Sequence, residues 1–119
     1  MQQLFIGEIP LSDGTVASVM LSESEARVEY RLWDGKRALF RFTGVAGTID
    51  RNSAGQEIEA LETSSIRSAG DPFVEGLLQE RPQNRTAELQ RFAFIGSWTM
   101  QPVLEIFAES VEAERAYGV

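Results

Sequence analysis

The stretch ARVEYRLWDGKRALFRFT, residues 26–43, decides the fold of this chain. Two runs of alternating apolar and polar residues flank Asp34-Gly35, a dipeptide typical of tight turns between strands. Successive side chains of a strand point to opposite faces, so each run has one apolar face. The stretch therefore predicts a long antiparallel β-hairpin. Its inward face carries Val28, Tyr30, Leu32, Ala38, Phe40 and Phe42.

A three-residue loop at the turn permits two registers for this hairpin. The first sets Glu29 opposite Arg41, and opposite charges across a strand pair are favourable by about 0.2–1 kcal/mol. The second sets Arg27 opposite Arg41 and places Gly35 in the left-handed conformation that glycine adopts readily. Both registers give the same inward face, so the predicted core does not depend on the choice.

The rest of the chain contains further strand patterns. Residues 3–9 and 15–21 read as strands separated by a turn, and residues 50–55 read as a loop. Residues 57–64 alternate weakly and are compatible with either a strand or a short helix. Residues 112–119 read as an acidic, fraying tail.

A second hairpin is predicted from residues 89–97 and 103–113, with Phe94 opposite Ile106. Its other face is also apolar, through Ala93, Ile95, Val103 and Phe107. An antiparallel strand with one face in water would alternate, so both faces of this hairpin must be covered. A helix can cover one face. The other needs another sheet, barrel closure or a second protomer.

One helix is predicted near residues 72–81. Asp71 suits the capping position and Pro72 the first helical position, while Pro82 ends the segment. Gly76 in its middle costs about 1 kcal/mol relative to alanine, and we expect it to pack closely against the sheet.

These patterns predict an α+β fold. We expect one curved, mostly antiparallel sheet of about five to seven strands with a single helix packed across it. Barrel-like closure is the structural alternative. At 119 residues, the chain is expected to form a single domain spanning residues 1–119.

Composition excludes several classes of function. Eleven basic and eighteen acidic residues give a net charge of −7, which argues against nucleic acid and anionic membranes as partners. The chain has no cysteine, and its first residues lack the basic and apolar regions of a signal peptide. We therefore expect a cytoplasmic protein, of bacterial origin.

The residue types present also limit catalysis. Without histidine or cysteine, Ser-His-Asp and Cys-His mechanisms are excluded. Two carboxylate pairs, Glu57 with Glu59 and Glu105 with Glu109, share strand faces, but glutamate on the wet face of a strand is ordinary. The chain lacks a glycine-rich phosphate loop. We predict no catalytic residue, no cofactor and no metal site.

The remaining candidate is an interaction surface. Trp and Arg are favoured in protein interfaces, and several lie on the predicted outer face of the central hairpin. The predicted surface comprises Arg31, Trp33, Arg37, Leu39, Arg41, Ile95 and Phe107. We expect a non-enzymatic protein-interaction module that self-associates as a homodimer or larger homo-oligomer. Two alternatives are a small-molecule or enzymatic pocket containing Tyr30, and an inhibitor or immunity-type protein that sequesters a partner.

Overall fold

Eleven strands and one helix make up the regions that the computed structural model describes, which are residues 2–66, 72–80 and 88–115. The elements are β1 (Gln2–Gln3), β2 (Phe5–Ile6), β3 (Ile9–Pro10), β4 (Gly14–Leu21), β5 (Glu25–Arg31), β6 (Arg37–Thr43), β7 (Gly47–Asp50), β8 (Glu57–Ser65), α1 (Pro72–Glu80), β9 (Gln90–Gly96), β10 (Pro102–Ala108) and β11 (Ser110–Arg115).

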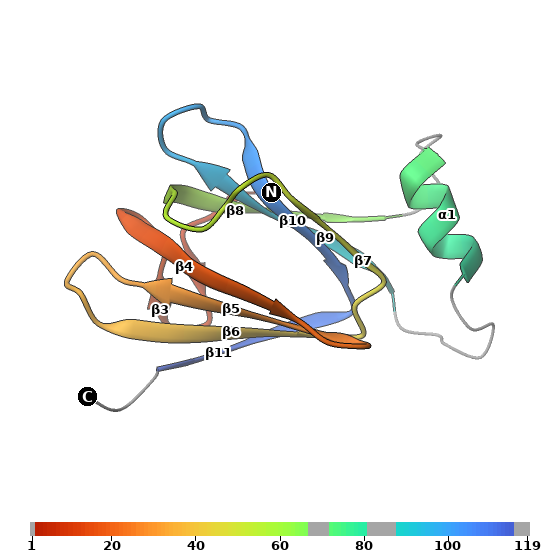
Figure 1. Ribbon diagram of the computed structural model, residues 1–119, viewed down its shortest axis with the longest axis horizontal. Coiled ribbons are helices and arrows are strands. Elements are labelled where there is room, and N and C mark those ends of the chain that lie inside the picture. The colour runs from red at the N-terminus through yellow and green to blue at the C-terminus, as the bar shows by residue number, and fades with distance from the viewer. Residues whose placement is uncertain (1, 67–71, 81–87, 116–119) are drawn as a thin grey trace.

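One antiparallel sheet of nine strands forms most of the molecule. Its order is β11-β6-β5-β4-β8-β9-β10-β7, and β1 also pairs with β8. Figure 1 shows that the sheet folds over on itself, so that β4, β5, β6 and β11 form one layer and β7 to β10 the other. The mostly antiparallel sheet with one short helix is confirmed. The predicted count of strands was too low, and the sheet is not closed into a barrel.

The central hairpin is β5 and β6, and it adopts the second of the two predicted registers. Arg27 lies opposite Arg41, and Gly35 has a positive φ of 86°. The like charges are tolerated because the Glu25 carboxylate contacts both side chains, at 2.8 Å from Arg27 Nε and 3.2 Å from Arg41 Nε. A third strand supplies Glu114, 3.6 Å from Arg41.

The first residues differ from the single predicted strand. They form three short strands, because Gly7 turns the chain with a φ of 59° and β2 pairs back onto β3. This small hairpin places Ile6, Ile9 and Leu11 in the main core. Residues 57–64, left open between strand and helix, lie in β8, with a register shift between Ile58 and Ala60.

The chain crosses between the layers at two neighbouring corners. After β6, Gly44 turns with a φ of 63° and leads into β7, a strand that the sequence did not predict. After β10, the chain bends at Glu109 and continues as β11 beside β6. The positive φ favours glycine at this corner, and a Cβ on Gly44 would also displace the Glu109 carboxylate. Residues 112–115, predicted to fray, are therefore part of the sheet.

The main core lies between the two layers. Phe40 of β6 stacks on Phe94 of β9 with 6.1 Å between ring centroids, and Phe42 meets Phe92 edge to face at 5.3 Å. Tyr30 packs against Phe40 at 5.2 Å, and its hydroxyl donates a hydrogen bond of 2.5 Å to the Leu11 carbonyl. The inward face predicted for the central hairpin is buried throughout.

The second hairpin, β9 and β10, is covered on both faces by its own chain. Its inner face meets the other layer, while α1 packs on the outer face of β10 through Val74 and Leu77. The pairing differs from the prediction by two residues, since Phe94 lies opposite Leu104 and not Ile106. From Leu104 to Ala108 this even shift keeps each side chain on its predicted face. Val103, predicted on the outer face, packs instead in the main core, because the register shifts between Pro102 and Leu104.

Helix α1 begins at Pro72 as predicted, while Asp71, Arg81 and Pro82 fall outside the described residues. The expectation for Gly76 was wrong, because a Cβ there would meet nothing within 4 Å. Within the described residues, no helix is both long and apolar enough to span a membrane.

Candidate interaction surface

The tip of the central hairpin carries the most exposed part of the predicted surface. Residues 33–35 form the three-residue loop, with Gly35 donating to the Leu32 carbonyl and the Asp34 carboxylate accepting from the Lys36 amide. Leu32 is buried, and the side chain that follows it, Trp33, is 68% exposed. A large indole is thus held in water on a short, hydrogen-bonded turn.

Two arginines flank this tryptophan. Arg31 and Arg37 lie directly opposite each other at the ends of β5 and β6, and both are exposed. Neither forms an ion pair with any residue in the described parts of the chain. We call Arg31, Trp33 and Arg37 the hairpin patch.

The other two predicted residues on this hairpin belong to its ion-paired end. Arg41 is shared between Glu25 and Glu114, and Leu39 is half-buried between β5 and β11. A hydrogen bond from Arg27 lowers the pKa of the Glu25 carboxyl, and the charge of Arg41 adds to this effect. These charges are satisfied within the chain.

Ile95 and Phe107 do not join the hairpin patch. Ile95 is 4% exposed and Phe107 is 2% exposed, both within a single chain. Phe107 meets Phe73 of α1 edge to face, with 5.4 Å between ring centroids. The apolar outer face of the second hairpin is therefore an interior surface and not a docking site.

A second exposed tryptophan lies at the same end of the sheet. Ser97 donates to Glu57, Glu57 lies opposite Thr15, and Thr15 lies opposite Arg31. This row places the loop between β9 and β10 at the same end as the hairpin patch. That loop presents Trp98 at 84% exposure and Met100 at 55%. The sequence pattern predicts only a connection at this loop, although a tryptophan in a short hairpin loop indicates exposure.

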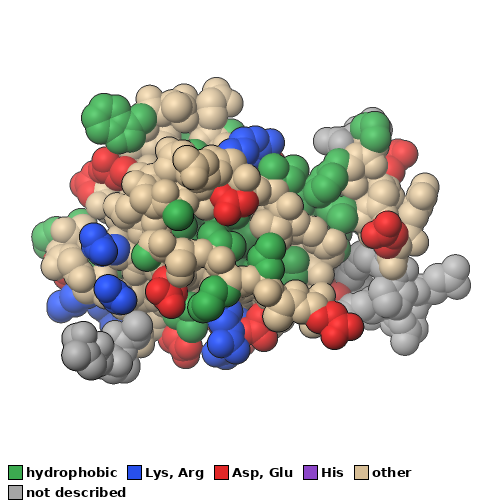
Figure 2. All heavy atoms as spheres, viewed as in Figure 1, with side chains coloured by type: hydrophobic (Ala, Val, Ile, Leu, Met, Phe, Trp, Pro, Cys, Tyr) green, Lys and Arg blue, Asp and Glu red, His purple; other side chains and the backbone are tan. Residues whose placement is uncertain are grey.

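The outer edge of β4 was also missed. β4 stays paired with β5 along its length, but its ladder to β8 ends after Thr15. Beyond that point Val16 donates to the Gln56 carbonyl and accepts from the Gly55 amide. The pairing of β4 with β5 shifts in register between Val16 and Ser18, at the point where β4 separates from β8. The side chains beyond it include Met20 at 46% and Leu21 at 61% exposure. Figure 2 shows several separate hydrophobic side chains on the face of the molecule along which β4 runs in Figure 1.

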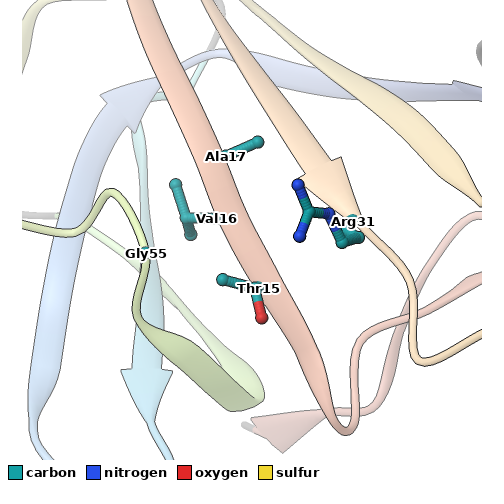
Figure 3. A pocket seen from close by; sticks show the side chains of 5 residues that line it. All are labelled: Thr15, Val16, Ala17, Arg31 and Gly55. Carbon is teal, nitrogen blue, oxygen red and sulfur yellow. The ribbon is translucent and has the colours of Figure 1, made fainter. Parts of the chain in front are cut away.

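A small hollow lies where β4 leaves β8. It measures about 180 Å³ and is lined by Thr15, Val16, Ala17, Arg31 and Gly55. In Figure 3 the Arg31 side chain extends from β5 over β4, with its guanidinium beside Ala17 and Thr15, while Val16 points the other way. The hollow thus links one arginine of the hairpin patch to the start of the free β4 edge.

The most buried charge lies elsewhere, on the outer face of β10. Burial raises the pKa of the Glu105 carboxyl, but hydrogen bonds from Arg51 and Arg91 outweigh it and hold that pKa below its usual value. The two contacts measure 2.5 Å and 2.7 Å, and Arg91 also reaches Glu62 at 3.3 Å. This closed network supports the structure and leaves no oxygen of Glu105 without a cationic neighbour.

No group of acidic residues in the described regions is arranged to hold a metal ion. Comparisons with protein-family models, curated proteins and solved structures found no match.

Proposed function

We propose that this protein is a non-enzymatic protein-interaction module and that the hairpin patch contacts its partner. The observation that carries the proposal is Trp33, 68% exposed on a short turn between Arg31 and Arg37. Tryptophan and arginine dominate the binding energy of protein interfaces, and a rigid turn loses little conformational entropy on binding.

The charge of the patch indicates the chemistry of the partner. Arg31 and Arg37 repel each other across the strand pair and have no carboxylate among the described residues. A partner that supplies carboxylates would relieve this repulsion. Because the chain as a whole carries a net charge of −7, an acidic partner would be repelled elsewhere, which would confine it to this patch.

The interior gives little support to a small-molecule pocket. Pockets for drug-sized ligands measure about 300–1,000 Å³ and are mostly apolar. The hollow beside Arg31 is smaller, at about 180 Å³. A wider one of about 590 Å³ lies between residues 7–9 and 113–115, and two glutamates and an arginine line it. Tyr30, the polar group expected in such a pocket, is buried and bonded to Leu11.

Self-association in a reducing bacterial cytoplasm is the second part of the proposal. Self-association was expected because the second hairpin is apolar on both faces, but α1 of the same chain covers the outer face of β10. The free, apolar edge of β4 supplies a different reason, since an exposed strand edge is a template for pairing with another chain.

The partner can be sought with matched variants immobilised on a resin. We expect the wild-type chain to retain at least one protein from its native cell extract that Trp33→Ala and Arg37→Glu both lose. Phe5→Ala and Arg115→Glu, which change an exposed aromatic and an exposed arginine elsewhere, should retain it. Identical sets of retained proteins for all five chains would contradict the proposed role of the patch.

A further inference from the structure

The free edge of β4 carries unpaired backbone groups that face outward. Ser22 donates to the Glu25 carbonyl at 2.9 Å, so these two residues form a hydrogen-bonded pair of the β4–β5 ladder. Such pairs alternate with non-bonded pairs, whose amides and carbonyls point to the other side. Val19 and Leu21 therefore point theirs away from β5. No other described residue bonds to them.

This edge is also free of charge. Residues 17–21 read ASVML, about 17 Å of extended chain without an acidic, basic or proline residue. Natural proteins usually protect free edges with such residues. The other long edge follows that rule, because β11 carries Glu112, Glu114 and Arg115. β7 and β1 are only 4 and 2 residues long.

We propose that two copies of the chain pair antiparallel through this edge and so extend their sheets into one. This rests on the self-association part of the proposed function and names its interface. A two-fold axis at Val19 places it opposite Val19 of the second copy, as a hydrogen-bonded pair that uses the outward amides and carbonyls. Ser18 then lies opposite Met20 of the second copy, and the exposed Met20 and Leu21 side chains leave water.

The charges on the next strand fit this arrangement. Within one chain, Met20 lies opposite Arg27 and Ser18 lies opposite Glu29. In the dimer, each row across the outer face therefore runs Arg27, Met20, then Ser18 and Glu29 of the second copy. Glu29 has no ion pair with the described residues of its own chain. The two-fold axis gives two such rows, and each has an arginine from one copy at one end and a glutamate from the other copy at the other end. Like charges therefore do not share a row.

Disulfide trapping tests the register directly, because the chain has no native cysteine. The proposed pairing brings the Cα atoms of Ser18 and Met20 of the second copy to about 4.5 Å, within disulfide range. A mixture of the single variants Ser18→Cys and Met20→Cys should yield the mixed disulfide dimer under mild oxidation. Each variant alone should give far less dimer. A mixture that cross-links no better than the separate variants would overturn the register.

Light scattering after gel filtration tests the interface without a cross-link. We expect the wild-type chain to have the mass of a dimer. Val19→Pro, which removes an outward amide and no bond to β5, should shift it to a monomer, as should Met20→Lys. Trp98→Lys, an equally polar change at an exposed apolar residue, should remain dimeric. Circular dichroism confirms that each variant is folded.

The outcomes separate this inference from the role of the hairpin patch. A monomeric wild-type chain, or a dimer that survives both edge variants, would overturn the edge interface. Retention of an extended peptide by a monomeric wild-type chain, lost in Val19→Pro, would also overturn it, because the edge would then serve another occupant. Trp33→Ala and Arg37→Glu should leave the dimer intact whichever result the patch gives.

Discussion

Phe107 of β10 and Phe73 of α1 meet edge to face on the outside of the sheet, with 5.4 Å between ring centroids. This contact seals the second apolar face of the hairpin formed by β9 and β10. The helix thus covers an apolar face that would otherwise need a second protomer to bury it. The surfaces proposed here for partners are therefore the hairpin patch and the β4 edge.

Replacing Phe107 by alanine should therefore cost stability and leave oligomeric state unchanged. Removing a buried phenylalanine typically costs about 3–5 kcal/mol in the free energy of unfolding. Urea denaturation measures this change, and Phe5→Ala, at a 54% exposed phenylalanine, should stay within about 0.5 kcal/mol of the wild type. An equally small loss for Phe107→Ala would show that α1 does not cover this face.

Gly76→Ala should stabilise the protein. Gly76 lies in the middle of α1, has open space around its Cβ position and does not have a positive φ. The gain expected from helix propensity is about 0.5–1 kcal/mol. Gly14→Ala is the contrasting variant, because its Cβ would lie 2.3 Å from the Tyr30 ring, and it should destabilise. A higher melting temperature for the first and a lower one for the second would confirm both environments.

Tyr30 should make the protein sensitive to alkaline pH. Burial raises the pKa of the Tyr30 phenol well above its usual value, and the carboxylates of Glu57 and Asp13 raise it further. The unfolded phenol ionises near pH 10. The stability gained from keeping the buried phenol un-ionised is therefore complete below about pH 10. It is lost as the pH rises toward the pKa of Tyr30 in the folded protein. Stability of the wild type should therefore fall as the pH rises above about 10.

Tyr30→Phe serves as the control for that pH effect. It should be less stable than the wild type at neutral pH by about 0.5–1.5 kcal/mol, because the buried Leu11 carbonyl loses the hydroxyl of Tyr30 and keeps only the Gly14 amide as a donor. Its stability should fall less steeply above pH 10. Parallel curves for the two proteins would contradict the assignment of the alkaline loss to Tyr30.

Glu105 should produce the opposite pH dependence. Its pKa is held below the usual value by Arg51 and Arg91, so its contribution is present above about pH 4.5 and is lost as the pH falls. Glu105→Gln should cost about 1.5–3 kcal/mol at pH 7, typical of hydrogen bonds to charged groups. The wild type should approach the variant in stability as acid protonates the carboxylate. A constant difference down to pH 3 would contradict this.

Much of the fold follows from local patterns. The alternation in residues 26–43 predicts β5, β6 and the buried face, because a slip by one residue would expose Phe40 and Phe42. The register of this hairpin could not be chosen from the sequence, because the conformation of Gly35 favoured one register and the pairing of Glu29 with Arg41 favoured the other. Glu25, at the start of β5, contacts both Arg27 and Arg41, so the facing arginines do not prevent the register that Gly35 favours.

The remaining features depend on contacts distant in sequence. β7 is short and weakly patterned, and its partner β10 lies more than fifty residues away. β4 separates from β8 near Ala17, where the register of β4 on β5 shifts. No residue in the stretch ASVML, residues 17–21, indicates such a shift. For the candidate surface, strand alternation correctly placed Arg31 and Arg37 outside. Burial of Phe107 depended on the position of α1, which the sequence did not specify.

The most direct test of the interaction module is the affinity of the retained partner for variants of the hairpin patch, measured by calorimetry. We expect Trp33→Ala and Arg37→Glu each to weaken binding at least about tenfold, the loss typical of a central interface residue. Phe5→Ala and Arg115→Glu should bind like the wild type. Patch variants that bind within about twofold of the wild type would contradict the account.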